Sequence, residues 1–154
     1  MPDLATEKRL VFRILECWRE LRADRAMPTP EEMTLEMLGR DRKSCFALSL
    51  SPPGDVPRFT FIGPDFVEDG QDLVGQPRSA CSIETVLGAA TSCLDEVLAR
   101  RIPVCIGGLA RHTRRPVLFR SILLPLSSDG QRIDALIGAA NFRTIEGSVG
   151  LGDR

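Results

Sequence analysis

The sequence has little of the chemistry that enzymes and metal sites need. It contains one histidine, His112, and no Cys-x-x-Cys pair, so it offers neither a zinc signature nor a disulfide framework. It also lacks a Gly-x-Ser-x-Gly nucleophile motif, and the run IGGLA lacks the Gly-Lys-Ser/Thr ending of a phosphate-binding loop. We therefore expect no catalytic residues, no metal site and no enzymatic activity.

Charge and hydropathy exclude two further classes of partner. The formal net charge is -1 and the isoelectric point is about 5.9, so no global basic field argues for nucleic acid or an anionic membrane. The N-terminus carries acidic residues and no long apolar run, and no segment is apolar enough to span a bilayer. We expect a soluble cytoplasmic protein without membrane contact. There the five scattered cysteines would mostly be small buried hydrophobes: Cys17, Cys45, Cys81, Cys93 and Cys105.

The 154 residues fit one domain, which begins with an amphipathic helix and link over residues 1–28. Apolar residues recur there at three- and four-residue steps, with charged residues on the remaining faces. The apolar stripe is wide enough to cover its own domain on one side and to contact a second subunit on the other. We therefore predict a homodimer or partner contact through a set of stripe residues: Leu10, Ile14, Cys17, Trp18 and Leu21. Whether Trp18 meets its own sheet or a neighbour's stays open.

The middle of the chain predicts a hairpin between helical segments. Thr29 can cap a short helix that Gly39 ends. The runs CFALSL and RFTFI alternate with a period of two and flank the turn SPPGDVP. The run GPDFVEDGQDLVGQP indicates short helical turns. Residues 82–101 predict one longer helix, with Ser82 as N-cap and two arginines at its negative end.

Three further strands follow, in the runs PVCIGGLA, PVLFRSILLPL and RIDALIGAANF. Every link between consecutive strands within a run of strands is short enough for a hairpin. The order therefore predicts an α+β fold with a five-stranded antiparallel sheet, with helices on one face and the N-terminal helix covering the other. The core would span residues 29–143, and the Gly-rich residues 144–154 would form a flexible tail.

The last two strands are apolar on both faces. If Asp129 and Gly130 form a two-residue turn, large aliphatic residues lie on either side of the strand pair. Burying each stabilises the fold by roughly 1.5–3 kcal/mol. Both faces must therefore be covered.

Arg120 and Asn141 interrupt this apolar pair of strands on the same face. Either would be costly there unless paired, and we hypothesise that they line a cavity and bind an anionic or carbonyl-bearing ligand. The small residues Ala90 and Gly107 favour such a cavity, whereas the bulky aliphatics favour filling it. Alternatively, the two polar residues lie at the open end of the sheet, or pair with a carboxylate such as Glu84.

The order of elements resembles a PAS domain. The runs CWRELRADRAMP, RFTFIG, GQDLVG and SILLPLSSDGQRIDALIGAANF are similar to the short stand-alone bacterial PAS family that carries an N-terminal helix, over roughly residues 10–142. The resemblance implies a sensory or regulatory module in signal transduction, with a small cavity between sheet and helices and no intrinsic catalysis.

The resemblance also bears on cofactors. Haem-binding relatives use a histidine on the long helix, and residues 82–101 contain none; photoactive flavin relatives use a cysteine in an Asn-Cys-Arg-Phe-like turn that is missing here. The cofactor stays unknown, with haem and flavin disfavoured. We expect a sensor that binds a small molecule in its core and signals through a partner protein. The alternative is a ligand-free dimerisation or protein-interaction adaptor. The basic run RHTRRP would be a solvated hairpin tip or a docking patch for an acidic partner.

Overall fold

A computed structural model of the chain describes residues 4–50, 56–68 and 71–145. The flexible tail was predicted over residues 144–154; Thr144 instead ends β5, and the part from residue 146 onward lies outside these residues. Most of the predicted turn SPPGDVP also lies outside them. The strands are β1 (Cys45–Ser49), β2 (Arg58–Ile62), β3 (Val104–His112), β4 (Arg115–Leu126) and β5 (Ala135–Thr144). The helices are α1 (Leu4–Arg22), α2 (Val86–Ala90) and α3 (Leu94–Arg100), with short 3-10 helices η1 (Glu36–Ser44), η2 (Pro64–Phe66) and η3 (Arg78–Ala80).

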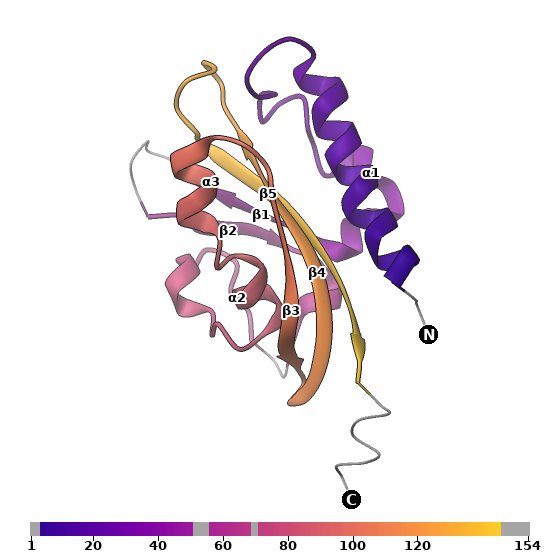
Figure 1. Cartoon of the computed structure of the whole chain (residues 1–154). Coiled ribbons are helices and arrows are strands. Elements are labelled where there is room, and N and C mark those ends of the chain that lie inside the picture. Colours follow the sequence, from indigo (N-terminus) through magenta and orange to yellow (C-terminus); the bar gives the residue numbers. More distant parts are fainter. Residues whose placement is uncertain (1–3, 51–55, 69–70, 146–154) are drawn as a thin grey trace, which may run out of the picture.

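The five strands form one antiparallel sheet in the order β2-β1-β5-β4-β3. Helix α1 lies across one face of the sheet against β4 and β5, and α2 and α3 pack against the other face (Figure 1). The α+β fold predicted from the sequence, with a helix on the second face, is therefore confirmed. Within the part of the chain that the structure describes, no helix is long and apolar enough to cross a bilayer.

Helix α1 is fixed to its own sheet. Leu10, Ile14 and Trp18 are buried, and the indole Nε1–H of Trp18 donates a hydrogen bond of 2.8 Å to the backbone carbonyl of Pro125 in β4. Trp18 therefore meets its own sheet, and the wide stripe of the helix covers β4 and β5. A homodimer or partner contact through α1 stays a prediction. Cys17 and Leu21 are half-buried and pack at the margin of the same core.

The connection between β4 and β5 is longer than the sequence predicts. Leu126 pairs with Ala135, so residues 127–134 form a loop in place of a two-residue turn. The Ser127 hydroxyl accepts from the Gly130 N–H at 2.8 Å and donates to the Arg132 carbonyl at 2.6 Å. The register differs from the predicted one by two residues, an even number, so every side chain keeps its predicted face. Arg120 consequently lies directly opposite Asn141.

The predicted helix over residues 82–101 is divided into α2 and α3. Thr85, rather than Ser82, caps α2 by accepting from the Gly88 N–H at 3.1 Å. The Thr91 hydroxyl contacts the carbonyls of Leu87 and Gly88 at 3.0 and 3.1 Å, a local interaction that competes with regular helix. The predicted helix after Thr29 is also wrong: Thr29 forms only a capped turn, and η1 begins at Glu36.

The Trp18 contact yields a prediction for stability. Trp18→Ala should lower the free energy of unfolding by about 3–5 kcal/mol, because it leaves a cavity and an unsatisfied buried carbonyl. Phe12→Ala, on the exposed side of the same helix, should change it by less than about 0.5 kcal/mol. Urea unfolding of both variants measures the difference. Equal losses would show that α1 does not rest on the sheet through Trp18.

The loop after β4 yields a prediction for pH. The backbone N–H groups of Arg132 and Gln131 lower the pKa of Asp129 from 3.8 to about 2. A carboxylate with a lowered pKa stabilises the folded state above its unfolded pKa, and this contribution disappears as the pH falls through about 2. Wild type should therefore have a higher melting temperature than Asp129→Asn at about pH 6, and this difference should disappear in acid. A gap in melting temperature that is constant with pH would contradict this assignment.

Candidate functional site

A PAS-like cavity was predicted on the face of the sheet that packs against α2 and α3, which we call the helix side. Large side chains fill this region. Phe46 of β1 lies against Gly138 of β5, so closely that a methyl group at Gly138 would overlap the phenyl ring. Phe66 meets Phe46 edge-on, with ring centroids 5.6 Å apart and planes at 81°. Both rings are buried. Gly138 therefore leaves room for the Phe46 ring rather than for a ligand.

A small pocket opens at the margin of this packed region. It has a volume of about 70 Å³, and its walls are side chains of β2, η2, α2 and the intervening segment: Ile62, Phe66, Val67, Glu68, Gln71, Asp72, Leu73, Val74 and Leu87. Pockets that bury a drug-sized ligand measure about 300–1,000 Å³. This pocket can hold a few water molecules and no large cofactor.

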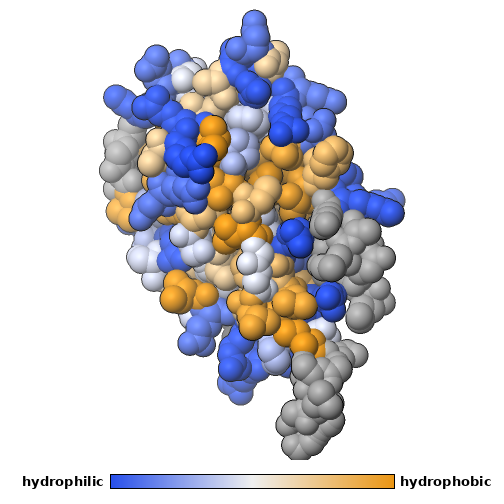
Figure 2. All heavy atoms as spheres, in the orientation of Figure 1, coloured by the Kyte–Doolittle hydropathy of each residue, from blue (hydrophilic) through white to orange (hydrophobic). Residues whose placement is uncertain are grey.

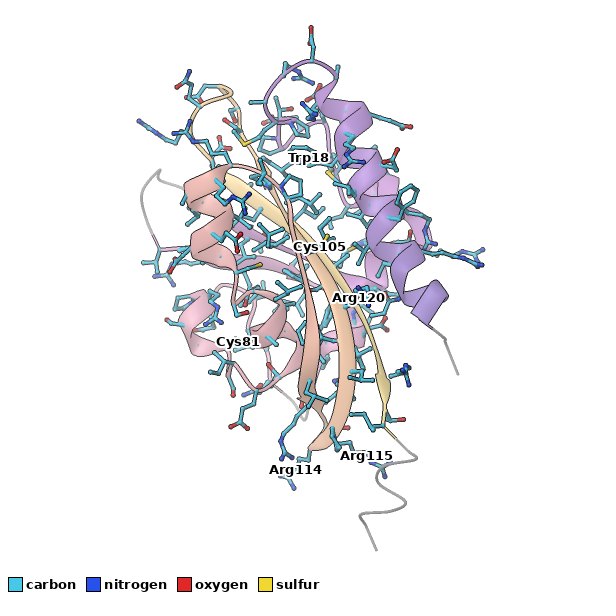
Figure 3. The ribbon with its side chains drawn as sticks, in the orientation of Figure 1. Trp18, Cys81, Cys105, Arg114, Arg115 and Arg120 are labelled. Atoms are coloured by element: carbon cyan, nitrogen blue, oxygen red, sulfur yellow. The ribbon has the colours of Figure 1, made fainter. Side chains whose placement is uncertain are left out.

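The four residues predicted to bind a ligand do not share a cavity. Ala90 is buried on α2, on the helix side of the sheet. Gly107, Arg120 and Asn141 are direct partners across β3, β4 and β5, and their side-chain positions lie on the α1 side. The predicted single cavity is therefore wrong, although three of its four residues form one row. Figure 3 shows Arg120 between the strands and α1.

The row retains unpaired polar atoms. Arg120 Nε and Asn141 Oδ1 are buried and have no hydrogen-bond partner among the described residues. The predicted alternative of a pair with Glu84 is not realised, since no ion pair of Arg120 occurs within the described ranges. The charge of Arg120 reaches Cys105 on β3, where partial desolvation raises the thiol pKa and the charges of Arg120 and Arg19 oppose this shift.

The cysteines are mainly packing residues, as predicted. Cys45, Cys81 and Cys93 are buried, Cys17 is half-buried and Cys105 is exposed. Burial raises the pKa of Cys81 and Cys93, and raises that of Cys45 to about 12. These three groups are therefore neutral thiols at physiological pH. Cys81 lies on the helix side of the sheet, away from Cys105 (Figure 3).

The basic run RHTRRP forms the β3–β4 hairpin tip. Thr113 and Arg114 both have positive φ, and His112 pairs with Arg115 around them, the geometry of a two-residue hairpin turn. His112 Nδ1 lies 3.6 Å from a carboxylate oxygen of Glu68.

The predicted absence of haem and flavin stays a prediction. Within the described residues, no three His, Cys, Asp or Glu side chains gather as metal ligands would.

The contact of Phe46 with Gly138 can be tested by a double-mutant cycle. Gly138→Ala should lower the free energy of unfolding by about 1–3 kcal/mol, because the added methyl group overpacks the core. In a Phe46→Leu background the same change should cost less, by about 0.5 kcal/mol or more. Chemical denaturation of the four proteins gives the coupling free energy. Additive effects would show that the two residues do not touch.

Comparison with known proteins identifies the family. A family model described as PAS domain matches residues 7–141, and no curated protein matches the chain. Similar solved structures include the light state of the blue-light photoreceptor Aureochrome1 LOV, at 14% identity and a TM-score of 0.48, covering 71% of this chain and 87% of that one. A Rhodobacter sphaeroides LOV protein has 12% identity and a TM-score of 0.48, with coverages of 92% and 71%. The PAS domain of Bordetella pertussis BvgS has 11% identity and a TM-score of 0.42, with coverages of 72% and 85%.

Similarities at this level carry no information about ligand or activity. The family model, in contrast, spans most of the chain. The protein therefore belongs to the PAS domain family.

Proposed function

We propose that this PAS domain is a regulatory module that acts through contact with a partner protein, without catalysis of its own and without a large ligand in its core. The observation that carries the proposal is the packing of Phe46 against Gly138. The buried Phe46 ring, with Phe66 edge-on against it, occupies part of the space between the sheet and the helices. Family membership supports the sensory or regulatory role.

The interior supports this adaptor reading over the core-binding sensor. The core is continuous from α1 through the sheet to α2 and α3, and protein interiors packed in this way transmit small displacements between their elements. A contact made at one surface can therefore bias the position of another element. Whether the protein forms a homodimer stays a prediction, which Leu10, Ile14 and Trp18 cannot mediate while they cover the sheet.

A second candidate function is the binding of a small anionic or carbonyl-bearing molecule on the α1 side. It is favoured by the buried Arg120 Nε and Asn141 Oδ1, which lack partners among the described residues. Buried polar groups are normally hydrogen-bonded, and an unpaired one costs about 1–3 kcal/mol. Gly107 has no side chain to obstruct access to Arg120 from β3. A carboxylate or carbonyl oxygen would satisfy the guanidinium.

Native mass spectrometry of gently purified protein tests the first proposal. We expect the native mass to equal a whole number of bare chains, because Phe46 fills the core. The visible spectrum of the same sample should lack haem and flavin bands. A stoichiometric small molecule that is released on denaturation would indicate a bound ligand. If Gly107→Val, a change on the α1 side, carries the same added mass, the ligand lies in the core and the proposal is overturned.

The second candidate has its own test. If an anion satisfies Arg120, Arg120→Ala should abolish an added small-molecule mass and remove any stabilisation by that ligand. Arg120→Lys, which keeps the charge and loses the forked donor geometry, should retain part of the binding. If both variants behave like wild type in ligand binding and in melting temperature, Arg120 does not form a site.

A further inference from the structure

The two edges of the sheet differ in their backbone hydrogen bonding. The outer edge of β2 is closed: Phe59 N–H donates to Gln76 at 3.0 Å, and its carbonyl accepts from Gly75 N–H at 2.7 Å. Strand β3 forms the opposite edge. Along an antiparallel pair, residues alternately direct both backbone groups toward the partner strand and away from it. The Arg111 N–H donates to the carbonyl of Glu84, outside the sheet. Because the direction alternates along the strand, Cys105, Gly107 and Leu109 also direct their backbone N–H and carbonyl groups outward.

Apart from Arg111, the outward-facing residues of β3 have no backbone partner in the part of the chain that the structure describes. Among the residues that the structure describes, none bonds to the backbone N–H or carbonyl of Cys105, Gly107 or Leu109. The pairing of β3 with β4 is continuous, so no bulge turns this edge away. Natural proteins usually protect such an edge with charges, prolines, bulges or a covering element. From Ile102 to Ala110 the chain has no charged residue. The middle of the β3 edge therefore carries none of these protections.

Exposed apolar side chains accompany the open edge. Leu109 of β3 is 70% exposed, and Ile83, which lines the same groove, is 66% exposed. Figure 2 shows hydrophobic residues running down the middle of this side of the molecule, with hydrophilic residues around them. A large apolar area of this kind commonly marks a contact with another protein.

Two grooves flank the edge. One, of about 350 Å³, lies between α1 and the start of β3 and includes Leu15, Trp18, Ile102 and Cys105. The other, of about 380 Å³, lies near the end of β3 and includes Ile83, Leu109 and Pro116. Cys105 and Leu109 are separated by about 13 Å along an extended strand. Side chains four residues apart on an added strand would therefore reach one groove each.

The charges at the two ends of the edge select its occupant. Arg19 and Arg22 line the first groove, and Arg100 and Arg101 precede β3 in the sequence. Arg19 and Arg100 already pair with Glu16 and Glu96, so among the described residues the uncompensated charge at this end comes from Arg22 and Arg101. Arg111 lines the second groove together with Glu84, and Arg114 and Arg115 follow at the hairpin tip (Figure 3). A second copy of β3 would bring arginines against arginines in either orientation, which is destabilising. An extended segment with an uncharged centre and acidic ends would complement both the edge and its flanks.

We propose that the open edge of β3 binds an extended segment of a partner protein by strand addition. The partner's backbone pairs with Cys105, Gly107 and Leu109, its apolar side chains enter the two grooves, and its acidic ends lie beside the flanking arginines. Main-chain hydrogen bonds supply affinity and alternate side chains supply selectivity in this mode of binding. The inference rests on the proposed function, and names the class of partner through which the module acts.

The probe is a short synthetic peptide with glutamates at both ends and an alternating threonine and valine centre. A matched peptide carries lysines in place of the glutamates. Amide hydrogen exchange should be fast at Gly107 and Leu109 in the free chain and slow with the glutamate peptide. Phe59, on the closed edge of β2, should be protected in both states. The lysine peptide should bind at least about tenfold more weakly, since its ends repel the arginines.

Variants at one exposed position separate backbone pairing from side-chain contact. Leu109→Pro removes an outward N–H that β4 does not use, and should weaken the glutamate peptide roughly tenfold. Leu109→Thr keeps that N–H and should bind within about threefold of wild type. Arg111→Glu leaves the strand intact and should shift preference from the glutamate peptide toward the lysine peptide. This charge exchange tests the proposal even if the proline variant does not fold.

Three results would overturn strand addition: equal affinity for the two peptides, unchanged exchange at Gly107 and Leu109, or slow exchange there in the free chain together with a dimer by sedimentation. The last would show that a second copy occupies the edge. A small molecule found in the core by native mass spectrometry would contradict the proposed function and not these peptide data. The two failures are therefore distinguishable.

Discussion

Apolar side chains on both faces of β4 and β5 determine the architecture of this PAS domain. One face packs against α2 and α3, and the other would lie in water without α1. The hydrogen bond from Trp18 to the Pro125 carbonyl fixes α1 where that second face is richest in aliphatic residues. Because the apolar stripe of α1 is buried against the sheet, only the outer side of this helix, which includes Phe12, is exposed.

The same need to fill space accounts for the helix side of the sheet. Gly138 has no side chain, and Phe46 occupies the space that one would take. The interior is thereby assigned to packing, and the unsatisfied chemistry lies elsewhere: the Arg120 and Asn141 row beneath α1, and the open backbone edge of β3. Regulation by protein contact follows more readily from this distribution than binding in the core. Strand addition beside β3 would also alter the environment of that row, because Gly107 pairs with Arg120.

The sequence predicts much of this fold because its strongest signals are local or follow from alternation. The double-faced apolar pattern around Leu123 and Leu124 predicts a covered sheet, and alternation places Arg120 with Asn141 on one face even though the predicted turn is wrong. It does not say which face that is. The loop from Ser127 to Asp134 depends on side-chain hydrogen bonds that no spacing rule reveals. The division between α2 and α3 coincides with Thr91, whose hydroxyl bonds to the carbonyls of Leu87 and Gly88, contacts that the sequence does not reveal. The open edge could be noticed as an uncharged strand between arginines, but only the strand order identifies β3 as terminal.

We infer that the protein's own side chains close its core and leave the β3 edge as the surface that acts on partners. A crystal structure of protein purified directly from cells is the decisive measurement. We expect the Phe46 ring to lie against Gly138, with no additional electron density between the sheet and α2. Density for a bound molecule there, with Phe46 rotated away from Gly138, would show that the core is a binding site.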